Sequence, residues 1–144
     1  IYEFSKLPYQ VNIAISLHAA DDELRNFLMP INKRYPLDEL IKAVKDYVKS
    51  TNRRVTFEYI LLKDINDKEE HAKELCRLVK GINCYINLIP YNENSNILYK
   101  RSKKDTIMRF YDIIKKEGIN VTIRKEFGSN ISAACGQLRS KKEE

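Results

Sequence analysis

The sequence is poor in the residues that mark several protein classes: it has no tryptophan and only four glycines, four prolines and three cysteines among 144 residues. Cys76, Cys84 and Cys135 are too few and too unevenly spaced for a disulfide framework or a CxxC-type metal site. No apolar run approaches the roughly 18 residues that a membrane span needs, and no signal-peptide pattern opens the chain. We therefore expect a soluble, cytoplasmic protein that does not associate with membranes.

The charged and apolar residues indicate a folded domain. Lys and Arg number 26 against 20 Asp and Glu, a formal net charge of +6, and 43% of the residues are hydrophobic. That hydrophobic share is enough for a buried core and argues against disorder. The length allows one domain or one part of a larger domain. Only the charged segment 139–144 is expected to be a disordered tail.

Short segments rich in β-branched and aromatic residues alternate with segments of helical periodicity. The predicted strands are residues 11–17, 55–62, 84–89 and 120–124. The predicted helices are a short one capped by Asp21 or Asp22 and stopped at Pro30, one opened by Pro36, and segments 67–80 and 104–117. This strict alternation favours an α/β fold, in which βα units form a parallel sheet with helices on its outside.

Each predicted strand has one apolar and one polar face. In the first strand, the polar face carries Asn12, Ala14, Ser16 and His18. We expect the apolar faces to pack against the helices and the polar faces to line the inside of a curved sheet, where a polar ligand or water can bind. An ordinary open sheet with one wet face is the alternative.

The number of predicted elements matches part of a barrel. Four strands with about three helices are half of a (βα)₈ barrel, whose usual length is about 250 residues. The chain is too short to close one, and its first strand begins soon after Ile1, which is not a methionine. We expect the missing strands to precede Ile1.

Ligands of parallel βα folds meet the carboxyl ends of the strands. The residues that follow the predicted strands are Ser16, Leu17, His18, Lys63, Asp64, Pro90, Tyr91, Asn92 and segment 125–135. Hydroxyl, imidazole and amide groups among them are candidates for contacts with a ribose, an amino acid or a base. Taken alone, His18 is more typical of a hydrogen-bonded structural histidine.

The three cysteines have different surroundings. Cys76 lies in an apolar helical stripe and Cys84 on the apolar face of a strand, so we expect both in the core. Cys135 lies among small residues between Gly128 and Gly136, which let a backbone approach a ligand closely. Its thiol is either a nucleophile, if its surroundings favour the thiolate, or a small residue in a tight turn.

Basic residues gather in several loops. They are Arg53, Arg54, Lys100, Arg101, Lys103, Lys104, Arg124, Lys125, Arg139, Lys141 and Lys142. Charge runs are usually solvated surface, but Tyr91 and Tyr99 interleave with some of these residues. A surface that contacts RNA phosphates is therefore the second interpretation.

Four ordered motifs carry a resemblance to a known family. They occupy residues 14–19, 30–33, 86–92 and 133–138 and read AISLHA, PINK, INLIPYN and AACGQL. Together they resemble the C-terminal half of the radical adenosylmethionine rRNA adenine-C2 methyltransferases. The likeness implies that residues 1–138 are the C-terminal part of a partial radical-SAM (βα) barrel. A sister group that methylates C8 of the same adenine is similar.

The resemblance implies roles for particular residues. Ser16, Leu17, His18 and Asn92 match positions that contact S-adenosylmethionine, and Cys135 matches the cysteine that receives a methyl group. In the family, a second adenosylmethionine is cleaved at a [4Fe–4S] cluster fed by a reducing partner, and a second cysteine then closes a disulfide. The implied substrates are rRNA and also tRNA.

The chain departs from the family pattern in one respect. It lacks the CxxxCxxC cluster motif, so no metal ligands are expected in it, and the second cysteine and the catalytic carboxylate have no match. We therefore expect a C-terminal fragment that is inactive alone. Two hypotheses from other classes remain: an RNA-binding module without chemistry, and a hydrolase with a Cys135–His18 nucleophile and base.

Overall fold

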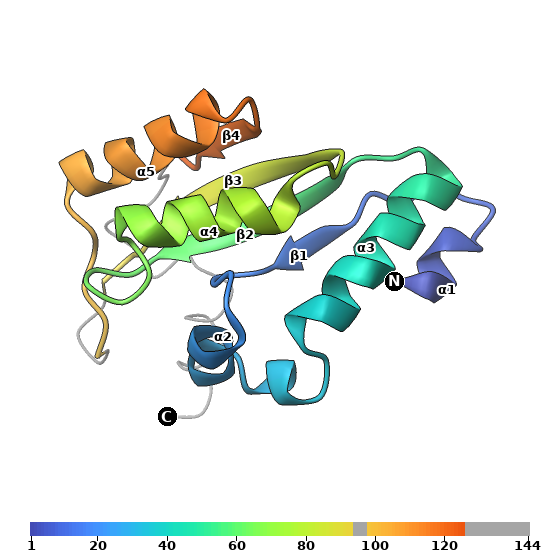
Figure 1. Cartoon of the computed structure of the whole chain (residues 1–144), viewed down its shortest axis with the longest axis horizontal. Helices are drawn as coiled ribbons and strands as arrows, with labels where there is room; N and C mark the ends of the chain where they lie inside the picture. Colours follow the sequence, from blue (N-terminus) through green and yellow to red (C-terminus); the bar gives the residue numbers. More distant parts are fainter. Residues whose placement is uncertain (94–97, 126–144) are drawn as a thin grey trace.

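The computed structural model describes residues 1–93 and 98–125 and contains a sheet with helices packed against it (Figure 1). In chain order the elements are α1 (Tyr2–Ser5), β1 (Ala14–Ser16), α2 (Asp22–Leu28), η1 (a 3₁₀ helix, Pro30–Lys33), α3 (Leu37–Thr51), β2 (Val55–Leu61), α4 (Glu69–Val79), β3 (Cys84–Pro90), α5 (Lys104–Lys116) and β4 (Asn120–Ile123).

The four strands follow one another in the order β1-β2-β3-β4, and each neighbouring pair is parallel. The α/β prediction with a parallel sheet is therefore confirmed. The register aligns Ser16 with Glu58, Glu58 with Asn87 and Asn87 with Thr122. Because side chains alternate between the faces of a strand, these four lie at one level on the same face.

The core lies between the sheet and the helices. Every second residue of β2 and β3 is buried, and α4 lies along these two strands (Figure 1). The apolar stripe of α4 in which Cys76 was predicted to lie is buried and consists of Ala72, Leu75, Cys76 and Val79. Tyr47 of α3 is also in the core and is 1% exposed, and its hydroxyl donates to the Val11 carbonyl at 2.5 Å, so the buried polar group has a partner.

The helix boundaries follow local signals in the sequence. The Asp21 side chain caps α2 by accepting a hydrogen bond from the Leu24 N–H at 2.8 Å, and Pro36 precedes α3. Gly81 and Gly118 follow α4 and α5 with φ of +77° and +75°. Glycine adopts this left-handed backbone without steric cost, which explains why these helices end there.

The first strand is shorter than the predicted segment 11–17. Regular pairing covers Ala14–Ser16, although the Thr56 N–H still donates to the Ile13 carbonyl. Further back, the Val11 carbonyl accepts from the side chains of Tyr47 and Arg53. The ladder stops there because side chains, not a neighbouring strand, satisfy that carbonyl.

The N-terminal helix α1 was not predicted. It packs against α3, and the Tyr2 hydroxyl donates to Asp46 Oδ2 at 3.0 Å. Four residues give too short a window for a periodic pattern, so only the contact with α3 distinguishes this helix from a loop.

The two faces of β2 provide a test of this architecture. Phe57 is 0% exposed against the helices, and Phe57→Ala should lower the free energy of unfolding by about 3–5 kcal/mol because it leaves a cavity. Thr56→Ala, one residue away on the other face, should cost less than about 1 kcal/mol. Urea unfolding of the two variants checks this, and equal losses would mean that the faces are assigned wrongly.

Candidate cofactor site at the strand ends

The sheet face opposite the helices carries a polar row. Ser16, Glu58, Asn87 and Thr122 share one level, and the Thr122 hydroxyl donates to Asn87 Oδ1 at 3.4 Å. Ser16 and Thr122 are exposed, and the other two are half-buried. The predicted division into an apolar face against the helices and a polar face away from them is therefore confirmed for these residues.

The end of β1 leads directly into the predicted cofactor segment. Leu17 is fully buried and its N–H donates to the Glu58 carbonyl at 2.9 Å, which continues the pairing with β2. His18 then turns the chain with φ of +62°, a left-handed conformation that is uncommon outside glycine. A non-glycine residue in this conformation must be held there by its contacts.

The contacts of His18 fix the state of its ring. Its Nδ1 accepts a hydrogen bond from the Ile60 N–H at 3.0 Å, so in the neutral ring the proton lies on Nε2. Burial, followed by the nearby Arg25 charge, lowers the pKa of His18 to about 4. At neutral pH the imidazole is therefore an uncharged hydrogen-bond donor through Nε2. Its low pKa and its occupied Nδ1 lone pair argue against a general base at this position.

Arg25 lies behind this segment and is 4% exposed. Its Nε donates to the Leu17 carbonyl at 3.0 Å and its Nη2 to the Ser16 carbonyl at 3.1 Å. Its Nη1 donates to Asn32 Oδ1 at 2.6 Å. Burial lowers the pKa of the guanidinium from its usual value, but Arg25 remains protonated at neutral pH.

Asn32 joins the Arg25 contacts to the helices that follow β1. It is 1% exposed, and its Nδ2 donates to Asp22 Oδ1 and to Asn26 Oδ1, each at 2.8 Å. Asp22 Oδ1 also accepts from the Leu37 N–H at 2.9 Å, and the hydrogen bond from Asn32 is the main reason why the pKa of Asp22 is lowered. This network ties α2, η1 and the start of α3 together.

Asn66 is a further buried polar residue at this end of the sheet and is 0% exposed. Its Nδ2 donates to the His18 carbonyl at 2.9 Å and to the Ile60 carbonyl at 2.7 Å. Its Oδ1 accepts from the Leu62 N–H at 2.8 Å. Three successive carbonyls, those of Ser16, Leu17 and His18, are therefore held by side chains.

Sequence reasoning missed both Arg25 and Asn66. In α2 an apolar residue would be expected to face the core, but Phe27 is 66% exposed and Arg25 is the buried residue of that helix. The only available signal was PINK at residues 30–33, which contains the Arg25 partner Asn32. It entered the sequence analysis as part of the family likeness, not as a hydrogen-bonding group.

The remaining predicted site residues are distributed as follows. Asn92 lies two residues after β3, at the carboxyl-terminal ends of the strands, as His18 does. The strand β2 lies between β1 and β3. Lys63 and Asp64 lie in the turn after β2, where the Asp64 N–H donates to Asp67 Oδ1 at 3.0 Å. Cys135 lies outside the described residues, as does segment 139–144.

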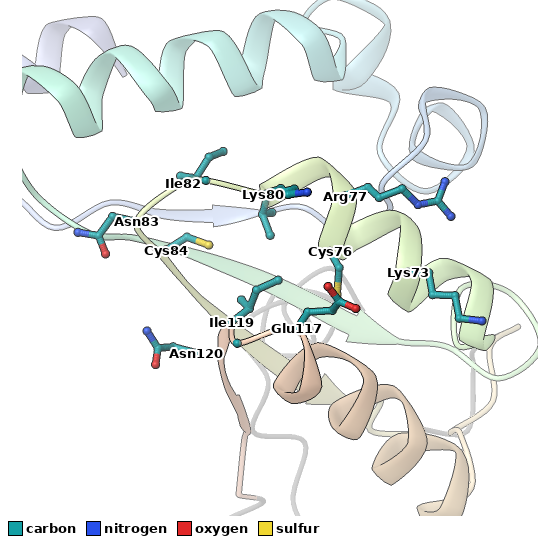
Figure 2. Close-up of a pocket in the computed structure, with 13 residues that line it drawn as sticks. Lys73, Cys76, Arg77, Lys80, Ile82, Asn83, Cys84, Glu117, Ile119 and Asn120 are labelled. Carbon is teal, nitrogen blue, oxygen red and sulfur yellow. The ribbon is translucent and has the colours of Figure 1, made fainter.

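Cys76 of α4 and Cys84 of β3 lie near the amino-terminal ends of the strands, away from the candidate site. Figure 2 shows them lining a pocket at the amino ends of β3 and β4, beside Glu117 and Ile119. They are 7% and 5% exposed, as predicted for core residues, and burial raises the pKa of each thiol to about 11. Both are therefore protonated and poorly reactive at neutral pH.

The described residues contain neither a metal-binding cluster nor a membrane-spanning helix. Within 1–93 and 98–125, no group of three or more His, Cys, Asp or Glu side chains could hold a metal ion. None of the helices in these ranges is both long enough and apolar enough to cross a membrane.

Several known proteins match the chain, although no family model does. The probable dual-specificity RNA methyltransferase RlmN of Caldanaerobacter subterraneus subsp. tengcongensis is 53% identical over 141 residues, which cover 98% of this chain and 41% of that protein. The protein of the same name from Spiroplasma citri is 52% identical over 143 residues, 99% of this chain and 41% of the relative.

Solved structures give the same result. A radical SAM methyltransferase from Sphaerobacter thermophilus superposes with a TM-score of 0.91 at 47% identity, covering 94% of this chain and 40% of that one. A domain of pyruvate-formate lyase-activating enzyme from Bacteroides vulgatus shares the fold alone, with a TM-score of 0.61 at 16% identity over 78% of this chain and 66% of that one.

These matches show what the chain is similar to. Over nearly its whole length it matches the C-terminal part of radical SAM dual-specificity RNA methyltransferases. It spans about two fifths of the length of the curated relatives described above. Those relatives are enzymes, by their names dual-specificity RNA methyltransferases.

The lowered pKa of His18 predicts a pH dependence of folding. Between about pH 6.5 and 4 the unfolded chain binds a proton at His18 that the folded chain does not, so stability should fall as the pH decreases through this range. The loss is at most roughly 3 kcal/mol. Urea unfolding at several pH values measures it. Asparagine tolerates the left-handed backbone, so His18→Asn should lose this part of the pH dependence of stability. If its stability fell with pH as steeply as that of the unsubstituted chain, His18 would not be the group responsible.

The burial of two cysteines predicts a difference in thiol reactivity. A thiol alkylating reagent should modify Cys76 and Cys84 slowly in the folded chain, because both are buried and protonated. From the sequence we predict that Cys135 reacts first. Peptide mass spectrometry over time reports each site, and in denaturant all three should react alike. Fast modification of Cys76 or Cys84 in the folded chain would show that the burial is incorrect.

Proposed function

We propose that this chain is the C-terminal part of an enzyme that methylates C2 of an adenine in 23S rRNA, and also an adenine in tRNA, by radical adenosylmethionine chemistry. The observation that carries the proposal is the 53% identity to a dual-specificity RNA methyltransferase over 98% of the chain. The strand-end geometry supports it independently, because it presents a hydroxyl and a neutral imidazole donor at one edge of a parallel sheet.

The groups at the strand ends fit adenosylmethionine chemically. This cofactor carries a carboxylate, a ribose diol and an adenine, and the chain offers the Ser16 hydroxyl, the His18 Nε2–H and the Asn92 amide as complementary groups. Bound adenosylmethionine supplies the methyl group and the hydrogen-abstracting chemistry. Ser16, Leu17, His18 and Asn92 would bind and orient it, and the uncharged His18 would not repel the positive sulfonium.

Cys135 would be the methyl carrier. Its thiolate would attack the methyl carbon of adenosylmethionine, so that a sulfur–carbon bond forms on Cys135 and adenosylhomocysteine leaves. The [4Fe–4S] cluster would be held by segments outside this chain, since the described residues offer no metal-binding group and the sequence has no CxxxCxxC. The disulfide partner of Cys135 and the site for a reducing partner would also lie outside the chain, which alone would be inactive.

The basic loops would contact the phosphates of the RNA. Lys100, Lys103 and Lys104 precede or open α5, and Arg124 and Lys125 follow β4 at the edge that carries the candidate cofactor site. Because salt weakens phosphate contacts, RNA binding should decrease as the salt concentration rises. An enzyme with these substrates would act in the cytoplasm.

Methyl transfer by the full-length enzyme tests the proposal. Cys135→Ala should abolish methylation of rRNA and tRNA while adenosylmethionine binding and the iron content stay unchanged. Cys76→Ala is the matched control, because it removes a buried thiol at the other edge of the sheet. Nucleoside chromatography distinguishes 2-methyladenosine from 8-methyladenosine. An 8-methyl product would indicate the resistance-type activity, and methylation by Cys135→Ala would disprove the carrier role.

A further inference from the structure

The Arg25 guanidinium is a buried charge that forms no salt bridge among residues 1–93 and 98–125, where the ion pairs are Lys6 with Glu3 and Lys42 with Asp46. The Asp22 carboxylate is close enough to favour the charged guanidinium, but it does not contact it. Burying a cation is unfavourable unless hydrogen bonds replace its water. Its acceptors are the Ser16 and Leu17 carbonyls and Asn32 Oδ1.

The position of those two carbonyls in the chain is informative. Regular pairing of β1 ends at Ser16, and at His18 the backbone is left-handed. Between these two points a strand ladder can no longer supply donors for both carbonyls. A single guanidinium fork fills this gap, because its N–H groups have fixed relative directions.

The guanidinium reaches the segment from α2 and bonds only to its backbone, which leaves the side chains of the candidate ligand groups outside this hydrogen bonding. The Ser16 side chain is on the polar face of the sheet, opposite the helices, and Asn66 holds the next carbonyl, that of His18. The direction of the Ser16 hydroxyl and the His18 ring therefore depends on a backbone that Arg25 fixes.

We propose that Arg25 is a positioning residue for adenosylmethionine binding, which fixes the Ser16 and Leu17 carbonyls so that Ser16 and His18 present their side chains in one arrangement. This inference rests on the proposed function. Arg25 does not touch the cofactor, and its effect passes through the backbone. Asn32 aligns the guanidinium and connects it to Asp22 and Asn26.

The test uses the full-length enzyme with Arg25→Lys, which keeps the charge but cannot form the fork. Calorimetric titration with adenosylmethionine should give a dissociation constant raised roughly tenfold, similar to the loss of affinity when a residue that orients a metal ligand is removed. Affinity for the RNA substrate should be unchanged. The ¹⁵N chemical shifts of the His18 ring should also change, because the hydrogen bond from the Ile60 N–H to Nδ1 depends on the same backbone.

Two further variants separate positioning from general stability. Tyr47→Phe also removes a buried side-chain donor to a backbone carbonyl, but this carbonyl belongs to Val11, which precedes β1. The variant should lower stability without changing the affinity for adenosylmethionine. Asn32→Ala leaves both carbonyl bonds of Arg25 possible and should weaken binding less than Arg25→Lys. Asn32→Ala provides the readout if the Arg25 variant does not fold.

The outcomes are distinguishable. Parental affinity in Arg25→Lys and Asn32→Ala, or equal weakening by Tyr47→Phe, would overturn the positioning role and leave the proposed function standing. An unsubstituted enzyme that does not bind adenosylmethionine would overturn the proposed function and this inference with it.

Discussion

The parallel arrangement of the strands is the constraint on which the rest of the structure depends. Neighbouring parallel strands require a crossover connection between them. The carboxyl ends of all strands therefore lie on the same side of the sheet, and a helix returns the chain to the side where the strands begin. Here that requirement places His18, the turn at Lys63 and Asp64, and Asn92 along one edge. Residues separated by more than seventy positions can therefore contribute to one site.

Backbone groups at the end of a parallel strand need new partners, and this need shapes the chemistry of the site. The Ser16, Leu17 and His18 carbonyls receive hydrogen bonds from buried side chains. This arrangement costs burial of an arginine and an asparagine. These hydrogen bonds restrain the segment without a ligand, and such restraint reduces the ordering that binding requires.

Sequence patterns predicted the elements well where the signal was local. The stripe of α4 and the alternation in β2 depend on residues three or four, or two, positions apart, and both match the structure. The partners of the site could not be predicted in this way, because Asn66 reaches the His18 carbonyl across 48 positions and Arg25 reaches Leu17 only after the chain has turned at His18. Cys135 remains a sequence prediction, since it lies outside the described residues.

The backbone of the two glycines that follow α4 and α5 determines which amino-acid configuration, L or D, these positions accept. At both Gly81 and Gly118 an added Cβ would meet nothing within 4 Å, so space does not explain the glycine. What these positions require is a positive φ, which an L-residue resists and a D-residue favours. In a chain assembled by chemical synthesis, D-alanine would therefore suit both helix ends and would restrict the unfolded chain more than glycine does.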